Sequence, residues 1–120
     1  MMNLNNELNI LYLNIFGQTK LPLEKQSQIS DLIKFYHCDI VHLQEIDIEE
    51  TTFQTCPFIT NNYTIISNNS LTKYGVASLV KNDWNVTNVS FDTEGRLIIF
   101  EIESVTFGNV YFPAGTDSNA

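Results

Sequence analysis

The sequence predicts an α/β fold in which a mixed β-sheet carries one main helix. The first 45 residues alternate between an apolar run, an amphipathic segment and a second apolar run, which is typical of a strand–helix–strand unit. The later residues form short apolar or alternating runs separated by turn-prone residues, which is typical of antiparallel strands. The 120 residues are 43% hydrophobic and 12% aromatic, which suffices for the core of one domain.

A strand–helix–strand unit is expected at the start of the chain. Residues 8–15 are apolar and rich in strand-forming side chains, and Phe16-Gly17 is expected to end this strand. Residues 39–45 form a second apolar strand. Because a helix separates the two strands, they should lie parallel and be joined by a right-handed crossover.

The helix between these strands is expected over residues 21–36. Pro22 near its start and Glu24 in its first turn are typical of a helix N-terminus. One face of the helix is apolar and should pack on the sheet, because four apolar side chains recur at helical spacing: Ile29, Leu32, Ile33 and Tyr36.

Five more strands are expected in the rest of the chain, at residues 63–67, 75–80, 84–91, 96–103 and 106–112. The turns between them are short, among them Asp92-Thr-Glu-Gly95, so neighbouring strands should be antiparallel. Alternation in the fourth of these strands places Ile98, Phe100 and Ile102 on one side. No linker divides the chain, so residues 1–120 are treated as one domain.

Charge and composition limit the partners and the compartment. Six basic and fourteen acidic residues give a net charge of −8, which repels nucleic acid unless cations or a local basic patch offset it. An acidic balance also suits a divalent-metal enzyme. The sequence shows no signal peptide or membrane-spanning segment, which predicts an intracellular protein, nuclear if its substrate is DNA. Cys38 and Cys56 are expected to be reduced thiols.

Three polar residues stand at the ends of expected strands: Asn14, Glu45 and Tyr111. The carboxyl ends of parallel strands meet at one edge of a sheet, so Asn14 and Glu45 should share a site. One carboxylate with neutral donors suits Mg²⁺, which keeps several waters. Each residue also has a structural alternative. Asn14 could be a turn residue, Glu45 a solvated acid, and Tyr111 a core aromatic whose hydroxyl is satisfied locally.

Tyr111 opens the segment Tyr-Phe-Pro-Ala-Gly-Thr-Asp at residues 111–117, where a buried strand meets a loop. Together with four earlier segments it resembles, in the same order, the first half of the endonuclease/exonuclease/phosphatase superfamily, which includes exonuclease III, apurinic endonucleases and DNase I. The Glu-Gly-Arg turn and the Tyr-x-Pro-x-Gly ending are most similar to non-LTR retrotransposon endonucleases. The matching segments are residues 9–17, 39–45, 74–80, 94–98 and 110–116, which cover nearly the whole chain.

The resemblance implies a fold and a chemistry. Residues 1–120 would form the N-terminal half of the four-layer α/β sandwich of the DNase I-like fold, with the C-terminal half absent, and would supply about one of its two sheets. The implied activity is that of a Mg²⁺-dependent (or Mn²⁺-dependent) phosphodiesterase that nicks DNA. The implied partner of the intact protein is DNA, and a fused reverse transcriptase could follow in the full-length protein.

The resemblance also implies roles for individual residues. Glu45 corresponds to the metal-binding carboxylate, with Gln44 beside it. Asn14 corresponds to the residue that assists at the metal and orders the scissile phosphate, and Tyr111 to the phenol that contacts the phosphate. Arg96 lies in the Glu-Gly-Arg turn, where it would support the substrate groove or form a salt bridge with a nearby glutamate, Glu94 or Glu101.

Two further expectations follow from what cannot be placed. The family's Asp-x-Asn and Asp-His pairs have no match, so we expect the 120-residue chain alone to be inactive. A lone sheet would expose an apolar face, so we also expect poor solubility.

Two alternatives to the implied function remain open. One is a phosphatase or sphingomyelinase-like enzyme acting on a phosphorylated lipid or sugar, which the acidic charge favours. The other is a catalytically dead half-domain from a partial gene.

Overall fold

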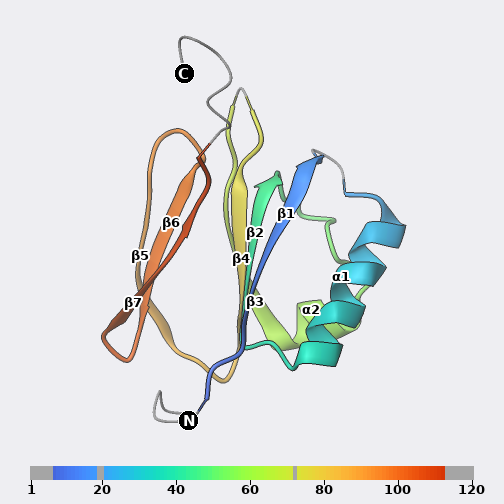
Figure 1. Ribbon diagram of the computed structural model, residues 1–120, viewed down its shortest axis with the longest axis horizontal. Helices are drawn as coiled ribbons and strands as arrows, with labels where there is room; N and C mark the ends of the chain where they lie inside the picture. The colour runs from blue at the N-terminus through green and yellow to red at the C-terminus, as the bar shows by residue number, and fades with distance from the viewer. Residues whose placement is uncertain (1–6, 19–20, 72, 113–120) are drawn as a thin grey trace.

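The chain folds into three layers, in which two β-sheets pack face to face and two helices cover the outer face of one sheet (Figure 1). This computed structural model describes residues 7–18, 21–71 and 73–112. Its elements in chain order are β1 (Ile10–Gln18), α1 (Leu23–Tyr36), β2 (Ile40–Ile46), α2 (Pro57–Asn62), β3 (Tyr63–Asn68), β4 (Val76–Lys81), β5 (Val86–Phe91), β6 (Leu97–Ile102) and β7 (Val105–Val110).

The first sheet has the strand order β1-β2-β4-β3, and only its β1–β2 pair is parallel. The strand–helix–strand unit is therefore confirmed. Strand β1, however, does not end at Phe16-Gly17. It continues to Gln18 through an irregular stretch in which Phe16 and Gly17 have φ angles of 60° and 82°. The remaining strands β5-β6-β7 form a second, antiparallel sheet.

The expectation that the chain supplies only one sheet is wrong, because β5, β6 and β7 pack on the face of the first sheet instead of extending it. The alternation in β6 is confirmed, since Ile98, Phe100 and Ile102 are fully buried. They pack against Ile40 and Val80 of the first sheet. Local alternation shows that β6 has a buried side, but it cannot show which surface covers that side.

Helix α1 packs its apolar face on the other side of the first sheet. Ile29 and Ile33 belong to that core, and Leu32 is half-buried. Tyr36, the fourth residue of the predicted apolar face, is 53% exposed. The helix ends there, because His37 adopts a left-handed conformation with φ 50°. The short helix α2 was not predicted, since it is only six residues long.

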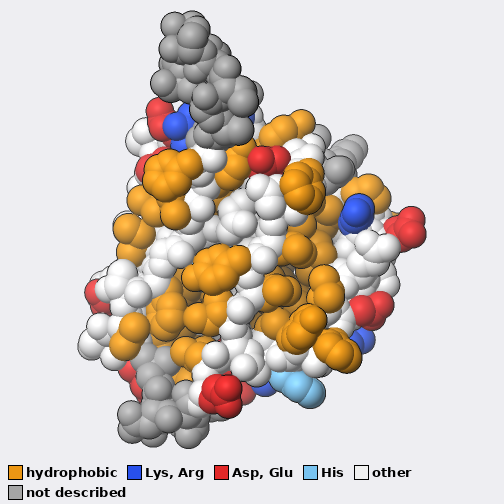
Figure 2. Space-filling model, in the orientation of Figure 1, with side chains coloured by type: hydrophobic (Ala, Val, Ile, Leu, Met, Phe, Trp, Pro, Cys, Tyr) orange, Lys and Arg blue, Asp and Glu red, His pale blue; other side chains and the backbone are white. Residues whose placement is uncertain are grey.

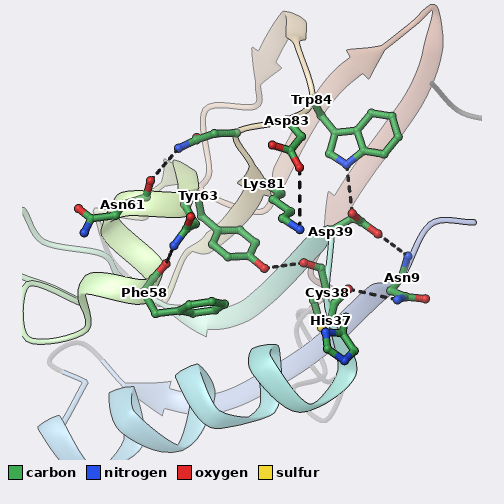
Figure 3. A network of polar contacts seen from close by, with 12 residues as sticks. Asn9, His37, Cys38, Asp39, Phe58, Asn61, Tyr63, Lys81, Asp83 and Trp84 are labelled. Carbon is green, nitrogen blue, oxygen red and sulfur yellow. Dashed lines mark hydrogen bonds and ion pairs between the residues drawn. The ribbon is translucent and has the colours of Figure 1, made fainter. Parts of the chain in front are cut away.

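A network of polar contacts joins the start of β2 to three other segments (Figure 3). The buried Asp39 carboxylate accepts hydrogen bonds from the backbone N–H of Asn9 at 2.9 Å and from Nε1 of Trp84 at 3.3 Å. The Tyr63 hydroxyl donates to the carbonyl oxygen of Cys38 at 2.5 Å, and burial is the main cause that raises the pKa of Tyr63 to about 12. This network holds the end of the molecule opposite the candidate site.

The two cysteines are free and buried, as expected. Figure 2 shows hydrophobic side chains gathered in the middle of one face of the molecule. At the free edges of the two sheets, Tyr12 of β1 is 61% exposed and Val105 of β7 is 46% exposed. Poor solubility was expected because a lone sheet would expose an apolar face. Here the second sheet packs on that face, and poor solubility stays a prediction. No helix in the described ranges is long and apolar enough to cross a membrane.

Candidate functional site

The candidate site lies where β2 ends, and a break in the alternation of this strand forms it. Val41 and Leu43 point toward the helices and belong to the core beneath them. Gln44 points the other way, toward the second sheet, where its Nε2 donates to Oδ1 of Asn109 at 2.8 Å. Strict alternation would return Glu45 to the helix side. Instead Glu45 has a φ of 56°, in the left-handed region that non-glycine residues seldom adopt.

This conformation is part of a β-bulge. Gln44 is paired with Val76 of β4, and the backbone N–H of Ile46 donates to the carbonyl oxygen of Gly75 at 3.0 Å. Glu45 is therefore the extra residue opposite two consecutive residues, Gly75 and Val76, where β4 begins. Bulges are frequent next to active sites, where they redirect a side chain.

The redirected carboxylate meets the tyrosine that follows β7. The Glu45 carboxylate raises the pKa of the Tyr111 hydroxyl, mainly by accepting a hydrogen bond from it, while the charge of Arg96 lowers this pKa to a lesser extent. The backbone N–H of Tyr111 donates to the carbonyl oxygen of Arg96 at 2.8 Å. Tyr111 is half-buried, and it joins the second sheet to the end of β2. Residues 113–117 of the expected site loop lie outside the described residues.

Asn14 lies beside this pair on the neighbouring strand, in register with Gln44. Its Oδ1 accepts a hydrogen bond from the backbone N–H of Phe16 at 2.7 Å, so the amide stabilises the irregular stretch of β1. The turn role that the sequence left open for Asn14 is therefore observed. One lone pair of Oδ1 remains for another partner.

Arg96 forms an ion pair with Glu94, with 3.4 Å between the nitrogen and the oxygen, which is one of the alternatives that the sequence left open. It also lines, with Tyr111, a cavity of about 240 Å³ whose wall includes Lys73 and Tyr74. The cavity wall thus carries two cationic side chains and one acid, Glu94, in a chain of net charge −8.

Tyr74 connects this cavity to β1. A Cβ atom on Gly17 would lie 2.7 Å from Cε2 of Tyr74, so only a glycine leaves room for the ring at this position. Gly17 also has a φ of 82°, which favours glycine independently. The Phe16-Gly17 pair that was expected to stop β1 therefore lets the Tyr74 ring pack against the strand at Gly17.

Lys73 and Asn109 were not among the site residues predicted from the sequence. No pattern distinguished Lys73 from any other loop lysine. Asn109 did leave a signal, since it lies two residues before Tyr111 within an apolar run and hence on the same side of the strand. Asp47, directly after β2, also bonds this region, since its Oδ1 accepts from the backbone N–H of Gly75 at 2.8 Å.

The residues at this site suit a hydrated divalent cation. The Glu45 carboxylate makes no ion pair within the described ranges, and its hydrogen-bond partner is a neutral phenol. Among the described residues there is no group of three or more histidine, cysteine or acidic side chains that could enclose an ion. One carboxylate with a nearby amide oxygen fits Mg²⁺, which keeps most of its waters, and does not fit Zn²⁺.

Comparison with solved structures identifies the fold. The chain is similar to an AP endonuclease from Archaeoglobus fulgidus, with 23% identity and a TM-score of 0.72 over 95% of this chain and 44% of that one. It is also similar to a truncated TDP2 from Caenorhabditis elegans (19% identity, TM-score 0.60, 82% of this chain and 43% of that one). It is similar as well to the AP endonuclease LMAP from Leishmania major (14% identity, TM-score 0.64, 87% of this chain and 40% of that one).

The sequence matches no protein-family model and no curated protein. The chain spans less than half the length of the solved structures it resembles. The expected mixed α/β fold, as part of the larger domain in these structures, is nevertheless confirmed, although the chain contains two packed sheets and not one.

Proposed function

We propose that this chain, which has the DNase I-like fold of the endonuclease/exonuclease/phosphatase superfamily, is the N-terminal part of a Mg²⁺-dependent phosphodiesterase that nicks DNA. The observation that carries the proposal is the left-handed backbone of Glu45 (φ 56°) at the end of β2, beside the tyrosine that follows β7 of the other sheet and whose pKa Glu45 raises. A backbone bulge that turns a carboxylate toward a phenol is a costly local arrangement, and such arrangements gather at functional sites.

In the proposed reaction Glu45 would hold the cation, and the amide oxygen of Asn14 would assist. When bound, the cation would neutralise the phosphate and stabilise the leaving oxygen. Tyr111 stays protonated at neutral pH, because its pKa is raised further above the ordinary value. Once Glu45 held the cation, the single O–H of Tyr111 would turn from the carboxylate to a phosphate oxygen, as a neutral donor next to a negative substrate.

Lys73 and Arg96 support a nucleic-acid substrate. They line the cavity beside Tyr111, and they would attract a phosphodiester backbone locally despite the acidic net charge. The finer assignment to a retrotransposon endonuclease is supported by the Glu-Gly-Arg turn at residues 94–96, which carries Arg96 into that cavity. A substrate on a phosphorylated lipid or sugar remains the second candidate, since the net charge of −8 favours it.

The base that would activate water is not among the residues assigned to this site, so we expect the pure 120-residue chain to bind but not to cleave. The first experiment titrates Mg²⁺ into the ¹⁵N-labelled chain by NMR. The amide signals of residues 44–46 should shift, and Glu45→Gln should abolish the shift. Glu24→Gln is the matched control, since Glu24 is an exposed glutamate in the first turn of α1 and should bind Mg²⁺ as the wild type does.

The second experiment adds a short DNA duplex, and separately inositol phosphate, in the presence of Mg²⁺. DNA should shift the signals of Tyr111, and Tyr111→Phe should weaken DNA binding about tenfold while leaving Mg²⁺ binding intact. Preferential binding of inositol phosphate would instead favour the second candidate. If Mg²⁺ shifted no residue near Glu45, the proposed function would be refuted. Mg²⁺-dependent nicking of plasmid DNA by the pure chain would refute the expected inactivity.

A further inference from the structure

Asn109 is a fully buried polar residue in the interface between the two sheets. It lies on β7, and its side chain reaches across to the first sheet. Its Nδ2 donates to the carbonyl oxygen of Ala77 at 2.8 Å, and more weakly to that of Leu43 at 3.3 Å. Oγ of Ser78 lies 3.1 Å from the same Nδ2, so the two hydrogens of this group are shared among three acceptors. Asn109 thus bonds the backbone of both central strands of the first sheet, β2 and β4.

The acceptor half of the same amide is engaged as well. Oδ1 of Asn109 accepts from Nε2 of Gln44 at 2.8 Å, and Gln44 immediately precedes Glu45. The two carbonyl partners require an NH₂ group on their side, so the amide orientation is determined. Aspartate has no NH₂ group to donate, and leucine would leave the carbonyl groups without this donor. The position therefore requires an amide for chemical reasons as well as for size.

These bonds connect the two halves of the candidate site. Through Gln44, Asn109 holds the residue that precedes the Glu45 bulge. Through β7, it lies two residues before Tyr111 on the same side of the strand, and Glu45 is near enough to raise the pKa of the Tyr111 hydroxyl. One side chain thus determines where the end of β7 lies over the end of β2, and its two connections meet at Glu45 and Tyr111.

We propose that Asn109 is a positioning residue, which sets the register of the second sheet on the first so that the Tyr111 hydroxyl and the Glu45 carboxylate meet. Its importance for catalysis rests on the proposed function, but its effect on geometry does not. Apolar side chains could fill the same space between the sheets, and they would slide more freely, because apolar contacts are non-directional. Four directional bonds at one side chain specify a single register.

The test uses two variants that break the network at different points. Asn109→Leu removes all four bonds at similar volume. Gln44→Met removes only the bond to Oδ1 of Asn109. Gln44 is only partly buried, so this variant should still fold even if the fully buried Asn109→Leu does not. The matched control is Ile102→Ala, which creates a cavity in the same inter-sheet core at a residue that takes no part in the network. The fluorescence of Trp84 reports folding in every variant, because it is the only tryptophan and is buried.

The readout is the NMR signal of the Tyr111 ring in chain labelled with ¹³C-tyrosine. In Asn109→Leu and Gln44→Met this signal should move to the position it takes in Glu45→Ala, where position 45 has no side-chain acceptor. The affinity for Mg²⁺ alone should fall about tenfold in both variants, as for other residues that orient a metal ligand. Ile102→Ala should lower stability without moving the ring signal or the Mg²⁺ affinity.

An unmoved Tyr111 signal in Asn109→Leu and Gln44→Met would overturn the proposal. So would an equal shift in Ile102→Ala, because Asn109 would then contribute only stability. The ring signal also separates this inference from the proposed function. If the wild type bound no Mg²⁺, the proposed function would fail while the ring signal still tested the positioning role.

Discussion

Protonation of His42 should destabilise the chain as the pH falls. This side chain lies on β2 between the sheets and is fully buried. Its Nδ1 shares a hydrogen bond of 2.8 Å with Oγ of Ser78, and its Nε2 has no hydrogen-bond partner in the described part of the chain. Burial lowers the pKa of His42 from 6.5 to about 4, since the imidazolium cation would lose its hydration there.

The size and sign of the effect follow from this pKa. The unfolded chain binds a proton at position 42 near pH 6.5, and the folded chain binds it only near pH 4. Between these values the unfolded state holds more protons, so stability is fully present above pH 6.5 and is lost as the pH falls. A difference of about 2.5 pKa units at about 1.36 kcal/mol each amounts to a loss of about 3 kcal/mol by pH 4.

The assay is urea unfolding at a series of pH values between about 7 and 4, followed by the fluorescence of Trp84. His42→Leu cannot titrate at this position, so its stability curve should fall less steeply than that of the wild type. The difference should approach 3 kcal/mol at the acidic end, an order-of-magnitude figure derived from the lowered pKa. His37→Asn is the control, because His37 is the other histidine and is exposed.

Two outcomes would refute this reasoning. If wild type and His42→Leu lost stability in parallel, His42 would not be the group that titrates. If His37→Asn removed the acid sensitivity instead, burial would not be its cause.

Three further outcomes are expected from single substitutions. Gly75→Ala should lower the free energy of unfolding in urea by about 1–3 kcal/mol, because the added Cβ would lie 2.3 Å from a backbone carbonyl oxygen. The control Gly108→Ala should be nearly neutral, because its Cβ would have no neighbour nearer than 3.9 Å. Equal losses in the two variants would contradict the clash. Asp39→Ala should cost about 1–3 kcal/mol, because it leaves the buried Nε1 of Trp84 without its acceptor; an unchanged urea midpoint would argue against it. Asp92→Ala should speed hydrogen exchange at the backbone amides of Arg96 and Leu97, which donate to its carboxylate, without affecting β1. Unchanged exchange would show that the turn does not need this carboxylate.

The positions of most strands, the main helix and the parallel pair at the start of the chain follow from the sequence alone. These features depend on hydrophobic period and on turn residues, which act over a few neighbouring positions. The same reasoning brought Asn14 and Glu45 to one edge of the sheet, since parallel neighbours end together. It did not find α2, because a helix of six residues has too few turns to show a period.

Only the tertiary structure decided how the strands divide into two sheets, and which way Glu45 points. The division depends on β6 packing against β2 and β4, and the bulge at Glu45 depends on the pairing of β2 with Gly75. Asn109 and Gln44 are 65 residues apart in the chain, and their hydrogen bond exists only once both sheets have formed. Local patterns determine the elements, whereas contacts between distant residues determine which side chains meet, because each such contact depends on the whole arrangement around it.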